Sequence, residues 1–193
     1  MSRSKHLLGW LLKIGEGSTI LRTSVKNFVG WIANGSPPWA ANREFMPDRL
    51  IALDEHPGVH PVGVGEMWRR LFVKIILKVT VLESTMAFQD DQLCAGTKAG
   101  IDGAIHEVQA LWEENSSMEK WDFLLVDAKN AFNEINQVVM LWTVRHLWSS
   151  ISRFSFNCYR HWSSLVLRNG NGMASILHSR ESVKQGGTLG MIA

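Results

Sequence analysis

The sequence predicts an α+β fold, and three observations lead to this prediction. First, 46% of the 193 residues are hydrophobic and 20% are charged, a balance typical of chains that fold around a core. Second, residues 49–65 and 163–179 each place two apolar runs around a turn, which is the pattern of a β-hairpin. Third, apolar residues elsewhere recur every three or four positions, as on one face of a helix.

The first elements are expected to be helical. Residues 5–34 have helical spacing, and Gly15 and Gly17 divide them into two short helices. Residues 34–42 read NGSPPWAAN, and a loop is expected there because two consecutive prolines stop a helix. The hairpin at 49–65 follows, with RLIAL and VHPVGVG as its strands and DEHPG as its turn.

Two helices, a strand and a further helix are expected next. Residues 65–88 predict a single amphipathic helix, and a second helix is predicted over 97–115. Residues 121–127, WDFLLVD, predict a strand, and residues 130–148 predict one continuous helix. The second hairpin then turns through NGNG, whose residues tolerate positive φ, and a loop containing glycines follows it.

The net charge of +2 is unevenly distributed. Residues 1–80 carry 11 Lys/Arg against 6 Asp/Glu, a net of +5, while residues 81–193 carry 9 against 12, a net of −3. This asymmetry fits a chain whose first part binds a polyanion and whose second part supplies functional carboxylates. A solvated surface produces the same signal, so charge alone does not decide between the two.

Cysteine usage and hydropathy bear on the compartment. Cys94 and Cys158 are far apart and belong to no metal-ligand cluster, so a reducing intracellular compartment, cytoplasmic or nuclear, is expected. The apolar stretch LFVKIILKVTVL is interrupted by Lys74 and Lys78, so no membrane span is predicted. The first residues lack a small-residue cleavage site, so no signal peptide is expected.

Three segments have a chemical interpretation beside a structural one. Asp127 either caps a helix with its carboxylate or binds a metal at the carboxyl end of a strand. PGVHPVGVGEMWRR is either a turn or a phosphate site, where glycines allow close approach and Arg69 and Arg70 supply charge. KQGGTLG is either a plain loop or a ligand contact through Gln185. No HExxH or GxSxG motif supports a hydrolase.

Together, the order and spacing of these motifs resemble the reverse transcriptase domain of non-LTR retrotransposons. The hairpin PGVHPVGVG stands close to WRRL, a strand ends in DAKNAFN, and a helix, a hairpin and KQGG follow. The resemblance covers residues 47–193 and is strongest at 49–80, 91–106 and 123–146. It implies the fingers and a partial palm of a right-hand polymerase, with the ferredoxin-like palm sheet incomplete.

The resemblance also implies a division of the chain. Residues 1–46 would form a helical N-terminal extension, and residues 47–120 a fingers-like region with the first hairpin and helices. Residues 121–193 would form the partial palm, which runs just past the QG motif. The implied reaction is template-directed deoxynucleotidyl transfer, with an RNA template, a DNA primer and a deoxynucleoside triphosphate as partners.

The resemblance assigns roles to individual palm residues. Asp127 and the carbonyl of Ala128 would bind Mg²⁺, of which the family uses two ions. The backbone amides of Asn130, Ala131 and Phe132 would hold the triphosphate at the start of a helix. The ring of Phe132 would exclude a 2′-hydroxyl and so select deoxyribonucleotides.

Further nucleotide contacts are implied by the resemblance. Gln185 and Gly186 match the QG motif that lies beside the incoming nucleotide and template, and Arg69 or Arg70 would contact phosphates. His60 occupies a nucleotide-binding position where the family has arginine, but a neutral imidazole makes no two-pronged phosphate contact. The family's QGDPL is QGGTL here.

The family's next palm motif, a strand hairpin written [YF]xDD, does not follow KQGGTLGMIA in these 193 residues. Asp127 is then the only palm carboxylate for two metal ions, so no polymerase activity is expected from this chain alone. The alternative is a non-catalytic nucleic-acid-binding remnant of a retroelement, which uses the basic first part.

Overall fold

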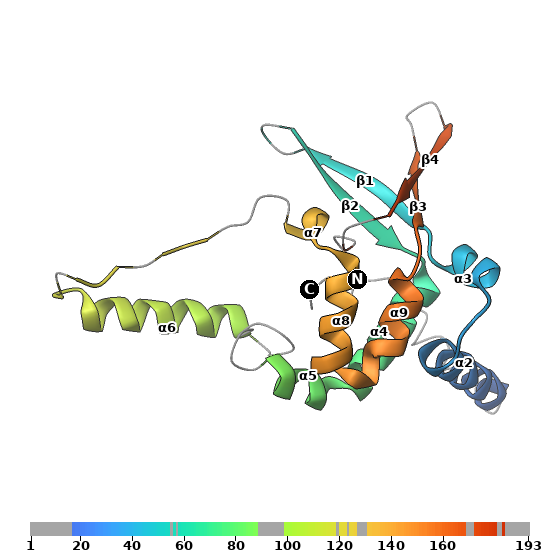
Figure 1. The fold of residues 1–193 in the computed structure, drawn as a ribbon, viewed down its shortest axis with the longest axis horizontal. Coiled ribbons are helices and arrows are strands. Elements are labelled where there is room, and N and C mark those ends of the chain that lie inside the picture. The colour runs from blue at the N-terminus through green and yellow to red at the C-terminus, as the bar shows by residue number, and fades with distance from the viewer. Residues whose placement is uncertain are drawn as a thin grey trace.

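Helices and strands interleave along the chain in the computed structural model, which describes residues 17–54, 56, 58–88, 99–118, 120–122, 124–126, 131–168, 172–180 and 183 (Figure 1). The helices are α2 (Gly17–Asn34), α3 (Trp39–Phe45), α4 (Met67–Val79), α5 (Val81–Phe88), α6 (Gly100–Asn115), α7 (Ala131–Glu134), α8 (Gln137–Leu147) and α9 (Ser149–Tyr159). The strands are β1 (Asp48–Asp54), β2 (Val59–Gly65), β3 (Ser163–Arg168) and β4 (Ala174–Ser179).

The four strands form one sheet in the order β2-β1-β3-β4. Both predicted hairpins are confirmed, since β1 pairs with β2 and β3 with β4 in antiparallel fashion. Their turns contain Gly58 and Gly172, whose φ angles of +121° and +82° favour glycine. The inner strands β1 and β3 run parallel, with Leu50 opposite Leu167. Thus two hairpins that are far apart in the sequence share a single sheet.

The hydrophobic core lies among helices α2, α4, α8 and α9. Phe72 of α4 and Phe154 of α9 are buried in it, as is Trp148 between α8 and α9. Ten buried side chains form this cluster: Val29, Ile32, Leu71, Phe72, Val73, Ile76, Val144, Trp148, Ile151 and Phe154. Residues from the predicted N-terminal, fingers-like and palm segments therefore pack together.

Buried amides tie the end of α2 to α9. The Asn157 side chain donates to the carbonyls of Ile32 and Gly35, at 2.8 and 3.0 Å. The Asn42 side chain donates in turn to the backbone carbonyl of Asn157. Since the last carbonyls of a helix have no partner within it, Asn157 satisfies groups that burial would otherwise leave unpaired.

Two predictions upstream of α6 are corrected. The predicted loop 34–42 ends early, because α3 begins at Trp39, directly after Pro38, and a fixed φ suits the entry to a helix. The single helix predicted over 65–88 is two helices, separated at Thr80. The Thr80 hydroxyl and amide both donate to the carbonyl of Ile76, and such local bonds compete with continued helix.

The strand predicted over 121–127 is wrong for the residues that the structure describes. Residues 121–122 and 124–126 belong to no strand, and Leu124, Leu125 and Val126 are 86%, 90% and 81% exposed. An apolar run becomes a strand only when a neighbour accepts its backbone hydrogen bonds. Residues 121–122 and 124–126 pair with none of the four strands of the described sheet.

The continuous helix predicted over 130–148 is also two helices, α7 and α8. Asn136 interrupts them and caps α8, because its side-chain oxygen accepts from the amides of Val138 and Val139 at 2.9 and 3.2 Å. Helix α9 follows at once, although no element was predicted there. The Glu83 carboxylate of α5 accepts from Ser149 and Ser150 in its first turn, and these bonds lower the pKa of Glu83.

Helix α6 confirms the helix predicted over 97–115 within the described residues. Its apolar side chains, Ile101, Ile105, Val108 and Leu111, are exposed rather than packed in the core. Figure 1 shows α6 well apart from the body formed by the sheet and the other helices. Among the described residues, no helix combines the length and the apolar character needed to cross a membrane.

Candidate functional site

Five of the predicted site residues lie outside the part of the chain that the structure describes. They are Asp127, Ala128, Asn130, Gln185 and Gly186. The side chains of His60, which lies in β2 opposite Leu53, and of Ala131, which opens α7, are likewise outside it. Their roles stay predictions. The described residues of the same segments, Phe132 and Val183, show how these segments meet.

One backbone hydrogen bond joins the two predicted palm motifs. The amide of Val183 donates to the carbonyl of Phe132 across 2.8 Å. Phe132 is half-buried in α7, and Val183 is buried two residues before Gln185. The segments that carry DAKNAF and KQGG are therefore in direct contact, although α8, α9 and the second hairpin separate them in the sequence.

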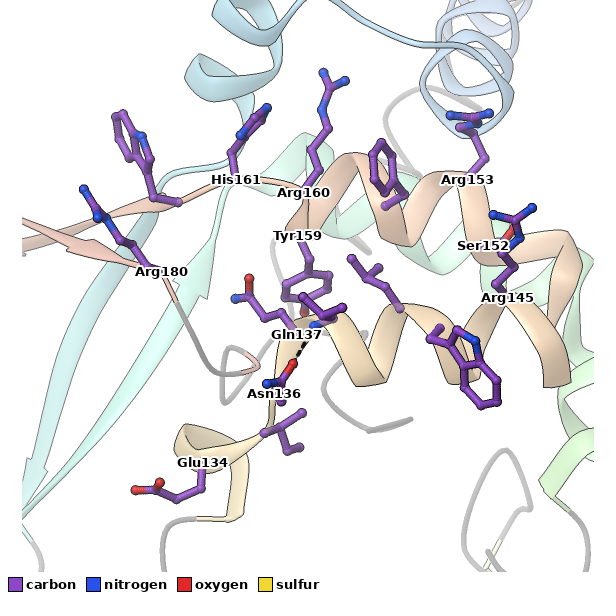
Figure 2. Close-up of a pocket in the computed structure, with 16 residues that line it drawn as sticks. Glu134, Asn136, Gln137, Arg145, Ser152, Arg153, Tyr159, Arg160, His161 and Arg180 are labelled. Atoms are coloured by element: carbon purple, nitrogen blue, oxygen red, sulfur yellow. Dashed lines mark hydrogen bonds between the residues drawn. The ribbon is translucent and has the colours of Figure 1, made fainter.

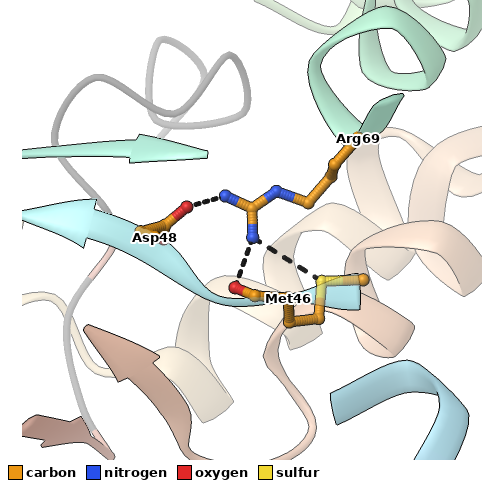
Figure 3. A network of polar contacts seen from close by, with 3 residues as sticks. All are labelled: Met46, Asp48 and Arg69. Carbon is orange, nitrogen blue, oxygen red and sulfur yellow. Dashed lines mark hydrogen bonds and ion pairs between the residues drawn. The ribbon is translucent and has the colours of Figure 1, made fainter. Parts of the chain in front are cut away.

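Arg69, predicted to contact phosphate, is buried between α4 and β1 (Figure 3). Its Nη2 forms an ion pair with Oδ1 of Asp48, and its Nη1 donates to the carbonyl of Met46 at 2.6 Å. Burial lowers the pKa of Arg69. Its guanidinium thus links the start of β1 to α4. The side chain of the next residue, Arg70, is half-buried.

Gly65 makes room for this buried pair. It lies opposite Asp48 in the β1–β2 register. A Cβ atom at Gly65 would collide with the guanidinium of Arg69 and stand 2.9 Å from Oδ1 of Asp48. The last glycine of VHPVGVG is therefore required for packing around Arg69, which is a structural reason for the glycine-rich strand.

A cavity of about 1100 Å³ opens along α8 and α9 (Figure 2). From α8 it is lined by Gln137, Val138, Leu141, Trp142 and Arg145, and from α9 by Ser152, Arg153, Phe156 and Tyr159, with Arg160 directly after α9. Positions three, four and seven residues apart share one face of a helix, so each helix presents a continuous stripe to the cavity. Residues 161–162, which lead into β3, and Arg180, which follows β4, complete the wall at the sheet.

The cavity is positively charged. Four arginines line it against one described carboxylate, Glu134, so the formal balance is 4 − 1 = +3. Arg160 donates to the carbonyl of Pro37 at 2.6 Å. Within the described residues no side-chain hydrogen bond or ion pair engages the guanidinium of Arg145, Arg153 or Arg180, all of which are exposed. Three guanidinium groups therefore remain available to an anion.

Aromatic rings alternate with these arginines. The guanidinium carbons of Arg153 and Arg160 lie 5.9 and 6.0 Å from the ring centre of Phe156, within the range of a cation–π contact. Trp142 is 63% exposed, and Phe156 is 43% exposed. Tyr159 is buried at the base, and burial raises the pKa of its phenol.

The sequence predictions did not include this cavity. The signal that identifies it is the spacing Arg-x-x-Phe-x-x-x-Arg over residues 153–160, which places one ring between two cations on a helix face. That spacing acquires meaning only once residues 149–159 are assigned to a helix.

Within the described residues, no three histidine, cysteine, aspartate or glutamate side chains gather as metal ligands would. The predicted ligands Asp127 and Ala128 lie outside those residues. No protein-family model, curated protein or solved structure matches the chain.

Proposed function

We propose that the chain is the fingers and part of the palm of an RNA-directed DNA polymerase of the non-LTR retrotransposon type. The observation that carries this proposal is the hydrogen bond from Val183 to Phe132. In such an enzyme the acid-bearing segment and the QG segment must meet around one incoming nucleotide. The contact between their described neighbours supports that arrangement, with RNA template, DNA primer and deoxynucleoside triphosphate as partners.

The proposed nucleotide site lies at the start of α7. The amides of Asn130, Ala131 and Phe132 hold the triphosphate, because free amides at the start of a helix attract an anion. Phe132 selects the deoxyribose by shape, and Gln185 with Gly186 lies against the base and template. The role of Phe132 is supported by its half-buried side chain and by the backbone bond that its carbonyl accepts from Val183.

The fingers hairpin supplies the remaining phosphate contacts in this proposal. The β1–β2 hairpin is followed directly by α4, which carries both predicted arginines. Because Arg69 is engaged with Asp48 and Met46, we assign the phosphate contact to Arg70, with His60 as a second, weaker nucleotide contact.

The metal requirement limits what the chain does by itself. We assign Asp127 and the carbonyl of Ala128 as Mg²⁺ ligands, and Mg²⁺ would neutralise charge on the triphosphate. Asp48, a carboxylate of the same hairpin region, is committed to Arg69. One palm carboxylate does not complete a two-ion site, so we expect no primer extension from this chain alone.

Sugar discrimination tests the nucleotide site. We expect calorimetric titration with Mg²⁺ present to show dATP binding about tenfold more tightly than ATP, because a ring that fills the 2′ position excludes the hydroxyl. Phe132→Ala should bring the two affinities together. Trp112→Ala removes an exposed ring from α6 and should leave the ratio unchanged. Equal binding of dATP and ATP by the unaltered protein would contradict the proposal.

Primer extension tests the expected inactivity separately. A labelled DNA primer on an RNA template should not be extended with Mg²⁺ or Mn²⁺. Template-dependent extension that Asp127→Ala abolishes would refute the inactivity and would at the same time support the polymerase assignment.

A further inference from the structure

The cavity along α8 and α9 has none of the described residues of the proposed nucleotide site in its wall. Of the described residues, none from β1, β2 or α4 lines it, and Arg70 and Phe132 are absent from its wall. Glu134 and Ile135 are the lining residues nearest to Phe132 in the sequence. The proposed polymerase chemistry therefore leaves its arginines and aromatic rings without a role.

We propose that this cavity is a second site, which binds single-stranded nucleic acid. Proteins that hold single strands combine cations along the phosphate backbone with aromatic rings on which bases stack. Here Arg145, Arg153 and Arg180 are the phosphate contacts, and Trp142 and Phe156 are the stacking surfaces. The inference does not require the chain to be a polymerase.

The spacing of the cations suits an extended polyanion. Of the three available arginines, Arg153 lies on α9, one helical turn before Phe156. Figure 2 shows Arg145 on α8 and Arg180 beyond β4, so the guanidinium groups are distributed along the cavity rather than gathered at one point. A single phosphate would use one of them, whereas a strand uses several.

The state of the arginines favours binding of an external anion. Arg145, Arg153 and Arg180 are exposed and have no carboxylate partner within the described residues. Arg160 is already bonded to Pro37, so it holds the loop between α2 and α3 and is not assigned to the ligand. Of the four arginines that line the cavity, Arg160 therefore has a structural role, and the other three are available to a ligand.

The aromatic rings favour bases over other anionic partners. Trp142 lies against His146, with ring centres 4.2 Å apart, and this contact holds its exposed indole in place. The ring centres of Trp162 and His178 of β4 are 4.4 Å apart, and this contact joins the cavity wall to the second hairpin. An acidic peptide would engage the arginines but leave these flat surfaces unused. Bases in a duplex are already stacked, so a single strand is the ligand that uses both features.

Fluorescence anisotropy with the full chain tests the site. The probes are labelled oligo(U) and oligo(dT) of about 12 nucleotides and a duplex of equal length, titrated between about 50 and 200 mM salt. Combined Arg145→Ala, Arg153→Ala and Arg180→Ala should weaken single-strand binding at least ~10-fold, and should reduce the salt slope by about 2, since each lost phosphate contact removes about 0.7. Trp142→Ala should weaken binding about 10-fold at an unchanged salt slope.

A charge-matched control is available. Combined Arg22→Ala, Lys26→Ala and Lys120→Ala removes three exposed cations away from the cavity and should change affinity less than about 3-fold. Thermal unfolding of each variant establishes that it is folded. The proposal is overturned if neither oligonucleotide binds, if both triple variants lose affinity equally, if duplex binds as tightly as single strand, or if polyglutamate competes as well as oligo(U).

Discussion

Arg69 is held in the interior by two oxygen atoms, one from the Asp48 carboxylate and one from the Met46 carbonyl. Asp48 is 1% exposed and Arg69 is 7% exposed, so the two charges are removed from water together. A buried pair of this kind adds little over a well-packed apolar pair, but removing one partner leaves an uncompensated charge. Arg69, which the sequence offered together with Arg70 as a phosphate contact, links β1 to α4 in the structure.

We expect Arg69→Met or Asp48→Asn to reduce the free energy of unfolding by about 3–5 kcal/mol, measured by urea denaturation. Combining Arg69→Met with Asp48→Leu should recover most of that loss, because no charge is then left buried. Arg70→Met is the matched control and should cost less than about 1 kcal/mol. Single variants as stable as the control would show that the pair is open to water.

At the scale of elements, the junction between α7 and α8 positions the candidate site. Phe132 belongs to α7, whereas the cavity stripe belongs to α8. The apolar periodicity of residues 130–148 is continuous, and for this reason it predicts one helix. The side chain of Asn136 satisfies two amides of α8 and so makes a new helix start more stable than continuation.

Asn136→Ala should change stability in opposite directions for a new helix start at Asn136 and for one continuous helix over residues 130–148. With a helix start at Asn136, the substitution should lower stability by about 1 kcal/mol, because two amides lose their acceptor. In a continuous helix, alanine would instead raise stability by several tenths of a kcal/mol or more. Asn136→Asp keeps an acceptor and should retain most of the stability. A higher unfolding midpoint for Asn136→Ala would contradict the observed junction.

On the scale of the whole molecule, pairing between distant segments decides which apolar runs are buried. The sheet brings β1 and β3 together, and the core joins α2 with α8 and α9. Residues 124–126 are as apolar as a buried strand but lie outside this arrangement. Whether they are packed is therefore a property of the tertiary structure.

The exposure of this run has a direct test. Leu124→Ser combined with Leu125→Ser should leave the thermal midpoint within experimental error, because neither side chain is buried, and should reduce binding of a hydrophobic dye. Leu71→Ser in the core is the positive control and should cost at least ~2 kcal/mol. A loss as large for the double variant would place residues 124–126 in a packed strand.

The two hairpins and most helical segments can be predicted from the sequence, because turn residues and apolar periodicity act within a few neighbouring residues. The glycine-containing turns and the helical spacing of α2 and α6 are signals of this kind. The pairing of Arg69 and the exposure of residues 124–126 depend on the packing of distant segments. The same packing brings Trp142, Phe156 and the arginines around one cavity. Burial and charge pairing depend on residues brought together from distant parts of the chain, and no local pattern encodes them.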